Sequence, residues 1–302
     1  MTRLTDPIRV RLLETLAGQR SGVPGWVQEF ERGEDVGFFG PDSAAWAVHG
    51  AMPTLVAGIR ALLMQALHPG ALAGVRDWSR YREDPLGRLA GTIRWIHTVT
   101  YGDTMQARQG SEWVLRLHER VVGTYIDARG VTRDYAANDP DLLSWVHLAF
   151  TDSFLSAHEL WGPPVPGGSD GYVAEWATAG ELMNVPNPPR TRADLKAQLA
   201  AFLPDLRGGA DADEIVRFVR QAPLRRALRP SYAVLFAGAV HSLESPYREL
   251  LGLREPRLGP IPLPITGATS LVLRGAGRML GPRSAGEIAA RRRLERLSAS
   301  AS

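Results

Sequence analysis

The sequence contains no cysteine among its 302 residues, and this absence excludes several kinds of chemistry at once. Without thiols the chain forms no disulfide, has no cysteine nucleophile and cannot hold zinc or an iron–sulfur cluster through sulfur. One short signature is also missing, the Glu-x-x-His of ferritin-like di-iron proteins. His158-Glu159 lacks the second histidine that the zinc-binding His-Glu-x-x-His helix requires. Several common enzyme classes are therefore excluded.

Lysine is nearly absent as well, because Lys196 is the single lysine among 35 basic residues. The net charge is +3, and so strong a bias toward arginine reflects genomic composition more often than a phosphate-binding surface. No stretch interleaves basic with aromatic residues, as nucleic-acid-binding surfaces do. We therefore expect no nucleic-acid partner.

Long apolar runs are the third absence. The longest, such as Ala233–Val240, are too short to span a bilayer, so we expect no transmembrane segment. Met1 to Gly18 carries charges throughout and lacks the apolar core of a signal peptide, which favours a cytoplasmic location. The basic stretch from Arg291 to Arg296 predicts a solvated charged helix, with contact to an acidic membrane surface as the alternative. Nothing in the sequence indicates the oligomeric state.

Apolar residues three and four apart recur along most of the chain and predict an all-α fold. We expect an N-terminal helix and loop at 1–43, a single helical domain at 44–251 and a C-terminal extension with a basic helix at 252–302. Ser270–Leu273 is the one strand candidate, and a single short run cannot make a sheet. The expected helices are Asp6–Leu16, Ala44–Gly50, Met52–Leu67, Ala71–Trp78, Pro85 to Gly102, Ser111 to Gly123, Leu142–Leu160, Tyr172–Leu182, Thr191–Leu203, Ala212–Gln221, Arg229–Leu243, Pro246–Leu251 and Ser284–Leu297.

The helix Met52–Leu67 is apolar on nearly all sides, which indicates a buried helix. Pro69 biases His68 away from helical dihedral angles, so the helix is expected to end there. His68 would then lie at the end of a buried helix, where its ring could donate to unpaired carbonyl groups.

His118 lies on a helix face that it shares with Leu115 and Val122. Val114 and Leu117 belong to the neighbouring apolar stripe, so His118 is expected at or near the buried edge. Two interpretations follow. The ring is either a core histidine satisfied by one hydrogen bond or an axial ligand offered to a haem iron.

Arg88 and Thr92 lie four residues apart and therefore one above the other on a helix. The pair is either ordinary surface chemistry or a guanidinium and a hydroxyl directed at one buried anionic or oxygen-bearing group. His97 on the same helix could be a second iron ligand or a distal acid, although a helix-surface histidine is the more common case.

A further helix carries four residues spaced four, three and four apart: His147, Thr151, Phe154 and His158. They share one face, which holds two imidazoles and a hydroxyl. The flanking residues are apolar, so we expect at least one of the two histidines to be buried.

Several short motifs, in a fixed order, carry a resemblance to a known family. The motifs are Ala66-Leu-His68-Pro69, Asp84-Pro85-Leu-Gly-Arg88-Leu-Ala-Gly-Thr92, Tyr101-Gly102-Asp103, Leu117-His118-Glu-Arg-Val-Val-Gly123, Asp139-Pro140-Asp-Leu-Leu-Ser-Trp145-Val-His147 and Tyr172 to Leu182. Together they cover about residues 44 to 251 and resemble the superfamily of the latex clearing protein. That superfamily groups bacterial rubber oxygenase, the fungal oxygenase MpaB and many bacterial proteins.

The resemblance implies an all-α fold that holds a b-type haem inside a helical core. His118 corresponds best to the family's proximal iron ligand, and Arg88 and Thr92 correspond to the arginine and threonine of its Arg-x-x-Lys-Thr motif. The lysine of that motif, which caps the distal side, falls on Gly91. The distal position would be open or filled by water or by another side chain such as His97, so rubber cleavage itself is not implied.

His68 and His147 resemble recurrent positions of the wider family and are secondary candidates for cofactor binding. The sequence thus predicts a haem b-dependent oxygenase that acts on an apolar organic substrate with O₂ or peroxide. In that enzyme Arg88 and Thr92 would line the distal side or anchor a polar group of the haem. One alternative is a protein that binds haem or an apolar ligand without turnover. Another is a cofactor-free helical protein whose histidines are ordinary core residues.

Overall fold

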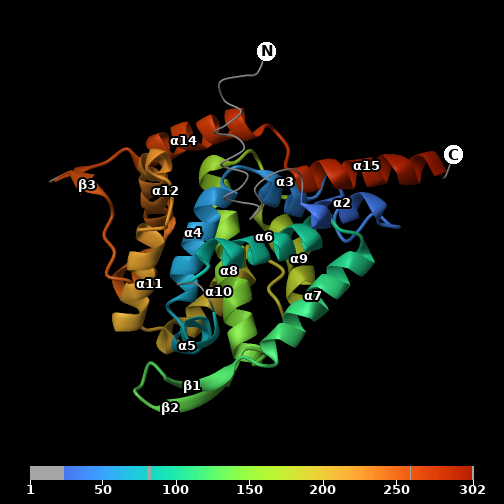
Figure 1. Cartoon of the computed structure of the whole chain (residues 1–302). Helices are drawn as coiled ribbons and strands as arrows, with labels where there is room; N and C mark the ends of the chain where they lie inside the picture. The colour runs from blue at the N-terminus through green and yellow to red at the C-terminus, as the bar shows by residue number, and fades with distance from the viewer. Residues whose placement is uncertain (1–23, 80–82, 259, 301–302) are drawn as a thin grey trace.

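Two helices pack lengthwise at the centre of the molecule, α4 (Thr54–Gln65) and α8 (Pro140–Trp161) (Figure 1). Buried residues occupy most of the circumference of both helices, as the sequence predicts for the first of them. The computed structural model describes residues 24–79, 83–258 and 260–300. The helix expected at Asp6–Leu16 lies outside these ranges.

Other helices surround this central pair, and the expected all-α fold is confirmed. They are α2 (Gly25–Arg32), α3 (Ala44–Gly50), α5 (Pro69–Trp78), α6 (Pro85–Tyr101), α7 (Thr104–His118), α9 (Gly168–Leu182), α10 (Arg192–Phe202), α11 (Ala210–Arg220), α12 (Arg229–Ser242), α13 (Ser245–Leu250), α14 (Ile265–Leu280) and α15 (Ala285–Ser300). Two short antiparallel hairpins complete the described chain: β1 (Val122–Ile126) with β2 (Thr132–Ala136), and β3 (Arg257–Leu258) with β4 (Ile261–Pro262).

The strand expected at Ser270–Leu273 is wrong, because these residues lie inside α14. The buried residues of α14 are Ile265, Thr269, Leu273 and Ala276, and their spacing of four, four and three is that of a helix packed on one side. The run of branched residues is therefore half of an amphipathic helix pattern that packs on α12.

The helix α7 begins and ends earlier than the sequence suggests. It starts at Thr104 rather than Ser111, because the Asp103 carboxylate accepts from the backbone of Gln106 (2.7 Å) and the Gln106 side chain accepts from Asp103 N (2.9 Å). This capping box satisfies orphan N–H groups of the first turn. The helix ends at His118, and the residues up to Gly123 enter the β1–β2 hairpin instead.

The C-terminal helix α15 is not the solvated helix that its charges predict. Arg293 is fully buried, and its guanidinium donates to the carbonyls of Phe30 (2.9 Å), Gly102 (3.3 Å) and Val36 (3.4 Å). Arg296 donates to carbonyls at the end of α2 as well. Helix ends and loops leave such carbonyls without intrahelical partners, and the arginines of α15 bind them. As a result α15 packs against both α2 and α6 (Figure 1).

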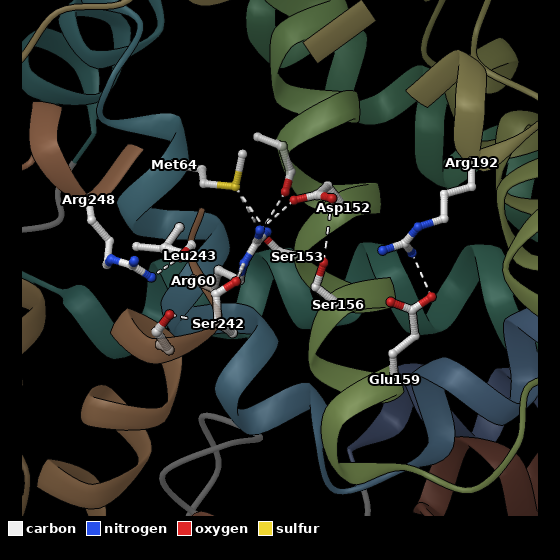
Figure 2. Close-up of polar contacts among 12 residues, drawn as sticks. Arg60, Met64, Asp152, Ser153, Ser156, Glu159, Arg192, Ser242, Leu243 and Arg248 are labelled. Atoms are coloured by element: carbon white, nitrogen blue, oxygen red, sulfur yellow. Dashed lines mark hydrogen bonds and ion pairs between the residues drawn. The ribbon is translucent and has the colours of Figure 1, made fainter. Parts of the chain in front are cut away.

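A buried ion pair fixes α4 against α8 (Figure 2). Arg60 and Asp152 approach to 2.5 Å, and both side chains are almost completely shielded from solvent. The same guanidinium donates to Ser153 Oγ (3.0 Å) and to the carbonyl of Ser242 (3.4 Å) at the end of α12. Three helices therefore converge on one charged group, and each of its three nitrogens has a partner.

No described helix is both long and apolar enough to cross a membrane alone. Among the described helices, one bent pair, α3 and α4 with an angle of 91° between them, reaches that length and apolarity when taken together.

Candidate functional site

The helices α6 and α7 form an antiparallel pair whose register brings two motif residues to the same end. Trp95 Nε1 donates to Ser111 Oγ across this pair (3.1 Å). Arg88 on α6 and His118 on α7 each lie about two helical turns from this contact, toward the same end of the pair. Thr92 lies one turn from Arg88 on the exposed side of α6.

His118 continues the covered stripe of α7. Ala107 and Ser111 are buried, Leu115 and His118 are half-buried, and these positions follow one another by three or four residues. Leu117, expected on the core face, is instead 37% exposed. The reason is that α7 lies on the outside of the molecule, so only one narrow side of it meets α6 and α9 (Figure 1).

An apolar cluster lies between His118 and the central helix α8, and we call it the site cluster. Its members are Trp95, Val114, Leu115, Leu143, Met183 and Val185. His118 lies one turn beyond Val114 and Leu115 on α7, and His147 lies one turn beyond Leu143 on α8. Two imidazoles on different helices therefore border the same apolar region.

His147 is buried with an unsatisfied ring nitrogen. Its Nε2 has no hydrogen-bond partner among the described residues. A Cβ added at Gly180 would lie 3.1 Å from this atom, so the lack of a side chain at residue 180 lets α9 pack closely on the ring. Burial lowers the pKa of His147 to about 4, so the ring is neutral at neutral pH. A buried polar atom without a partner is a candidate for function, and among the described residues His49, His97 and His158 each hold one as well.

His97 lies away from this group. Its ring meets Tyr101 edge-on (5.4 Å between centroids) and lies 6.0 Å from Trp26, while Gly286 of α15 covers its Nδ1. Burial lowers the pKa of His97 to about 4. The expectation of a helix-surface histidine is therefore wrong, because α2 and α15 cover this side of α6. The structure also separates His97 from His118, which does not favour a distal role.

His68 has a capping role that differs from the expected one. Its Nδ1 accepts from the backbone N–H groups of Gly70 (3.2 Å) and Ala71 (3.4 Å), which makes it the N-cap of α5. Pro69 occupies the first position of that helix, and the cap satisfies the N–H groups that follow. The ring accepts at the start of the next helix rather than donating at the end of α4.

The second histidine of α8 and one histidine outside the predicted set complete the buried imidazoles. His158 is buried, as is His147, and its Nε2 donates to the carbonyl of Pro163 (2.8 Å) beyond the helix end. His49 of α3 was not identified from the sequence. It packs on Trp176 (4.1 Å between centroids) and pairs through Nε2 with the hydroxyl of Tyr172 (3.2 Å). Burial holds the pKa of His49 well below its ordinary value.

A groove of about 340 Å³ runs between α7 and α9 beside the site cluster. It is lined by Phe38, Arg108, Glu112, Leu115, Thr178, Glu181, Leu182 and Asn184. Leu115 belongs to both the groove and the site cluster, so the groove ends one turn from His118. Its volume lies near the lower limit of ligand pockets, which range from about 300 to 1,000 Å³.

Comparison with protein families places these features in context. Residues 46–278, from α3 into α14, match the catalytic domain of the ER-bound oxygenase mpaB/B' and rubber oxygenase. No curated protein and no solved structure matches the chain. The family match covers well over half of the sequence and includes every member of the site cluster. The chain belongs to the mpaB and rubber oxygenase family of oxygenase catalytic domains.

Proposed function

We propose that this protein is a haem b-dependent oxygenase that acts on an apolar organic substrate, with His118 as the axial ligand. One observation carries the proposal: an apolar cluster bordered by His118 on α7 and by a buried, unsatisfied His147 on α8. The family consists of oxygenase catalytic domains, which supports oxygen chemistry at this position.

The donor set of the described residues suits haem. Among them, no three histidines or carboxylates are grouped so that they could hold a metal ion by themselves. Haem iron needs only one or two ligands from the protein, and the imidazole of His118 would supply one. Leu115, Met183 and Trp95 pack on one another at the site, so a bound macrocycle would replace this packing with contacts to its own apolar faces.

Each protein group then has a defined task. Bound haem would carry the oxygen chemistry. The protein would hold the iron through His118, exclude water and orient the substrate. Arg88, at the His118 end of α6, would pair with a carboxylate of the haem, and Thr92 would add a hydroxyl one turn away. His147, neutral at neutral pH, would accept a hydrogen bond inside the apolar region.

Absorption spectroscopy tests the cofactor. The purified protein is titrated with hemin and then reduced with dithionite, and we expect a sharp Soret band that saturates near one haem per chain. His118→Ala should lose or shift that band, whereas His241→Ala, at a partly exposed position on α12, should not. A flat visible spectrum contradicts haem binding, and an unchanged spectrum for His118→Ala contradicts the ligand assignment.

Turnover separates the proposal from its alternative. The haem-loaded protein is supplied with an isoprenoid alkene and either O₂ or hydrogen peroxide, and oxygenated products are measured by mass spectrometry. Oxidant-dependent product supports the oxygenase. Haem binding without product from either oxidant favours a binding protein, an alternative motivated by Gly91 in place of the family lysine.

A further inference from the structure

The α7–α9 groove contains an arginine, Arg108, that forms no ion pair with any residue that the structure describes. Of its two carboxylates, Glu112 pairs with Arg116 (3.8 Å) and Glu181 pairs with Arg190. Arg108 also lines the groove, but it forms neither an ion pair nor a hydrogen bond with any residue that the structure describes. The acids are thus already balanced, and the groove carries an excess positive charge at Arg108.

The Arg108 guanidinium is positioned by an aromatic ring instead of a carboxylate. It lies over Phe38, 5.5 Å from the ring centroid. A cation–π contact of this kind restrains the side chain and leaves its N–H groups available to a planar anion. Thr178 and Asn184 contribute a hydroxyl and an amide to the same groove.

Toward His118 the groove meets the apolar site cluster at Leu115. Trp95 contacts Trp176 near Ser111, and Leu115 packs with Met183, so α7 and α9 run in the same direction along the groove. From Arg108 the lining passes to Leu115 and Leu182 and then to the site cluster. His118 lies ten residues after Arg108, which is about 15 Å along the helix axis.

We infer that this groove binds an amphipathic carboxylate, with the carboxylate on Arg108 and the apolar chain directed toward His118. A chain of about 15 Å would bring its far end to the site cluster. Arg108 is then a specificity-determining residue that selects anionic over neutral apolar molecules. That the far end is oxidised rests on the function proposed above; the binding of the carboxylate does not.

Binding measured without turnover tests the inference. Dodecanoate, whose extended chain is about this long, is titrated into the full-length protein by calorimetry below its micelle-forming concentration, with methyl dodecanoate as the neutral analogue. We expect Arg108→Gln to weaken dodecanoate binding by about tenfold or more and to leave the ester unchanged, because a charge-assisted hydrogen bond is lost. Arg108→Lys should retain part of the affinity. Circular dichroism confirms that each variant is folded.

A matched control separates a local contact from net charge. Arg274→Gln removes the same charge from an exposed position on α14, away from the groove, and should leave dodecanoate binding unchanged. An equal loss in both variants, or equal affinity of the native protein for the acid and the ester, overturns the inference.

The titration is run with and without hemin, so that the groove and the haem are tested separately. Arg108-dependent binding in a protein that takes up no haem upholds the groove and rejects only the haem, whereas haem uptake with Arg108-independent binding rejects only the groove.

Discussion

The buried Arg60–Asp152 pair and the α7–α9 groove both contain arginine and acidic residues. They differ in how fully the arginine is paired with hydrogen-bond acceptors and counter-ions. In the first, the guanidinium meets a carboxylate, a hydroxyl and a backbone carbonyl between three helices. Among the described residues of the second, Arg108 has the face of Phe38 but no ion pair or hydrogen bond, and His147 has a buried nitrogen without a partner. The first region joins three helices, whereas the second is the one that we propose for binding.

The largest expected effect on stability comes from breaking the buried Arg60–Asp152 pair. Asp152→Ala leaves Arg60 buried without its counter-ion and should lower the free energy of unfolding by about 3–5 kcal/mol. Urea denaturation followed by circular dichroism measures the change. The matched variant Glu112→Ala breaks an exposed pair with Arg116 and should change stability by about 1 kcal/mol or less. Similar losses in both variants would contradict the contrast between the two regions.

Acid should destabilise the protein through its buried neutral imidazoles. The pKa of His97 is lowered to about 4 in the folded state, against 6.5 as the ordinary value. The unfolded chain therefore binds the proton first, and the stability present above pH 6.5 is lost as the pH falls toward 4. Between pH 7 and pH 5 this histidine should contribute a loss of about 2 kcal/mol, which His97→Gln should remove. Parallel pH profiles for both proteins would contradict the burial of His97.

The smallest expected effect compares two glycines on the helices of the site. Gly180→Ala places a methyl group 3.0 Å from both His147 and Pro188, so it should lower the free energy of unfolding by about 1–3 kcal/mol. Gly91→Ala, where a Cβ meets nothing within 4 Å, should raise it by up to about 1 kcal/mol. Thermal unfolding of the two variants gives the signs. Equal changes in melting temperature for the two variants would show that a methyl group at residue 180 does not crowd His147.

Sequence periodicity predicted the helices well where a single physical signal dominates. The apolar circumference of α4, the Asp84-Pro85 start of α6 and the Gly162 stop of α8 each appear in the structure. It missed the β1–β2 hairpin, because the turn depends on Gly130 in a left-handed conformation and on Asp127, whose carboxylate accepts from the backbone of the turn.

The candidate site was predicted only in part, for a related reason. Helical spacing indicates that His118 and the α8 histidines face inward, since that is a property of one helix. It could not reveal that His49 is enclosed by rings from α8 and α9, or that Arg293 is buried, since both depend on contacts between distant segments. An isolated histidine before Gly50 and an arginine within an arginine-rich run carry no local signal of burial.

Arg293 also bears on where this protein can be divided. The family match ends at residue 278, inside α14, yet the carbonyls that Arg293 holds come from Phe30, Val36 and Gly102, and α15 covers His97. A fragment that ends at residue 278 would expose the rings of Phe30, His97 and Tyr101, which Gly286 of α15 covers. It would also lose the contacts between α15 and α2. The packed core therefore extends beyond the region that matches the family and includes α15.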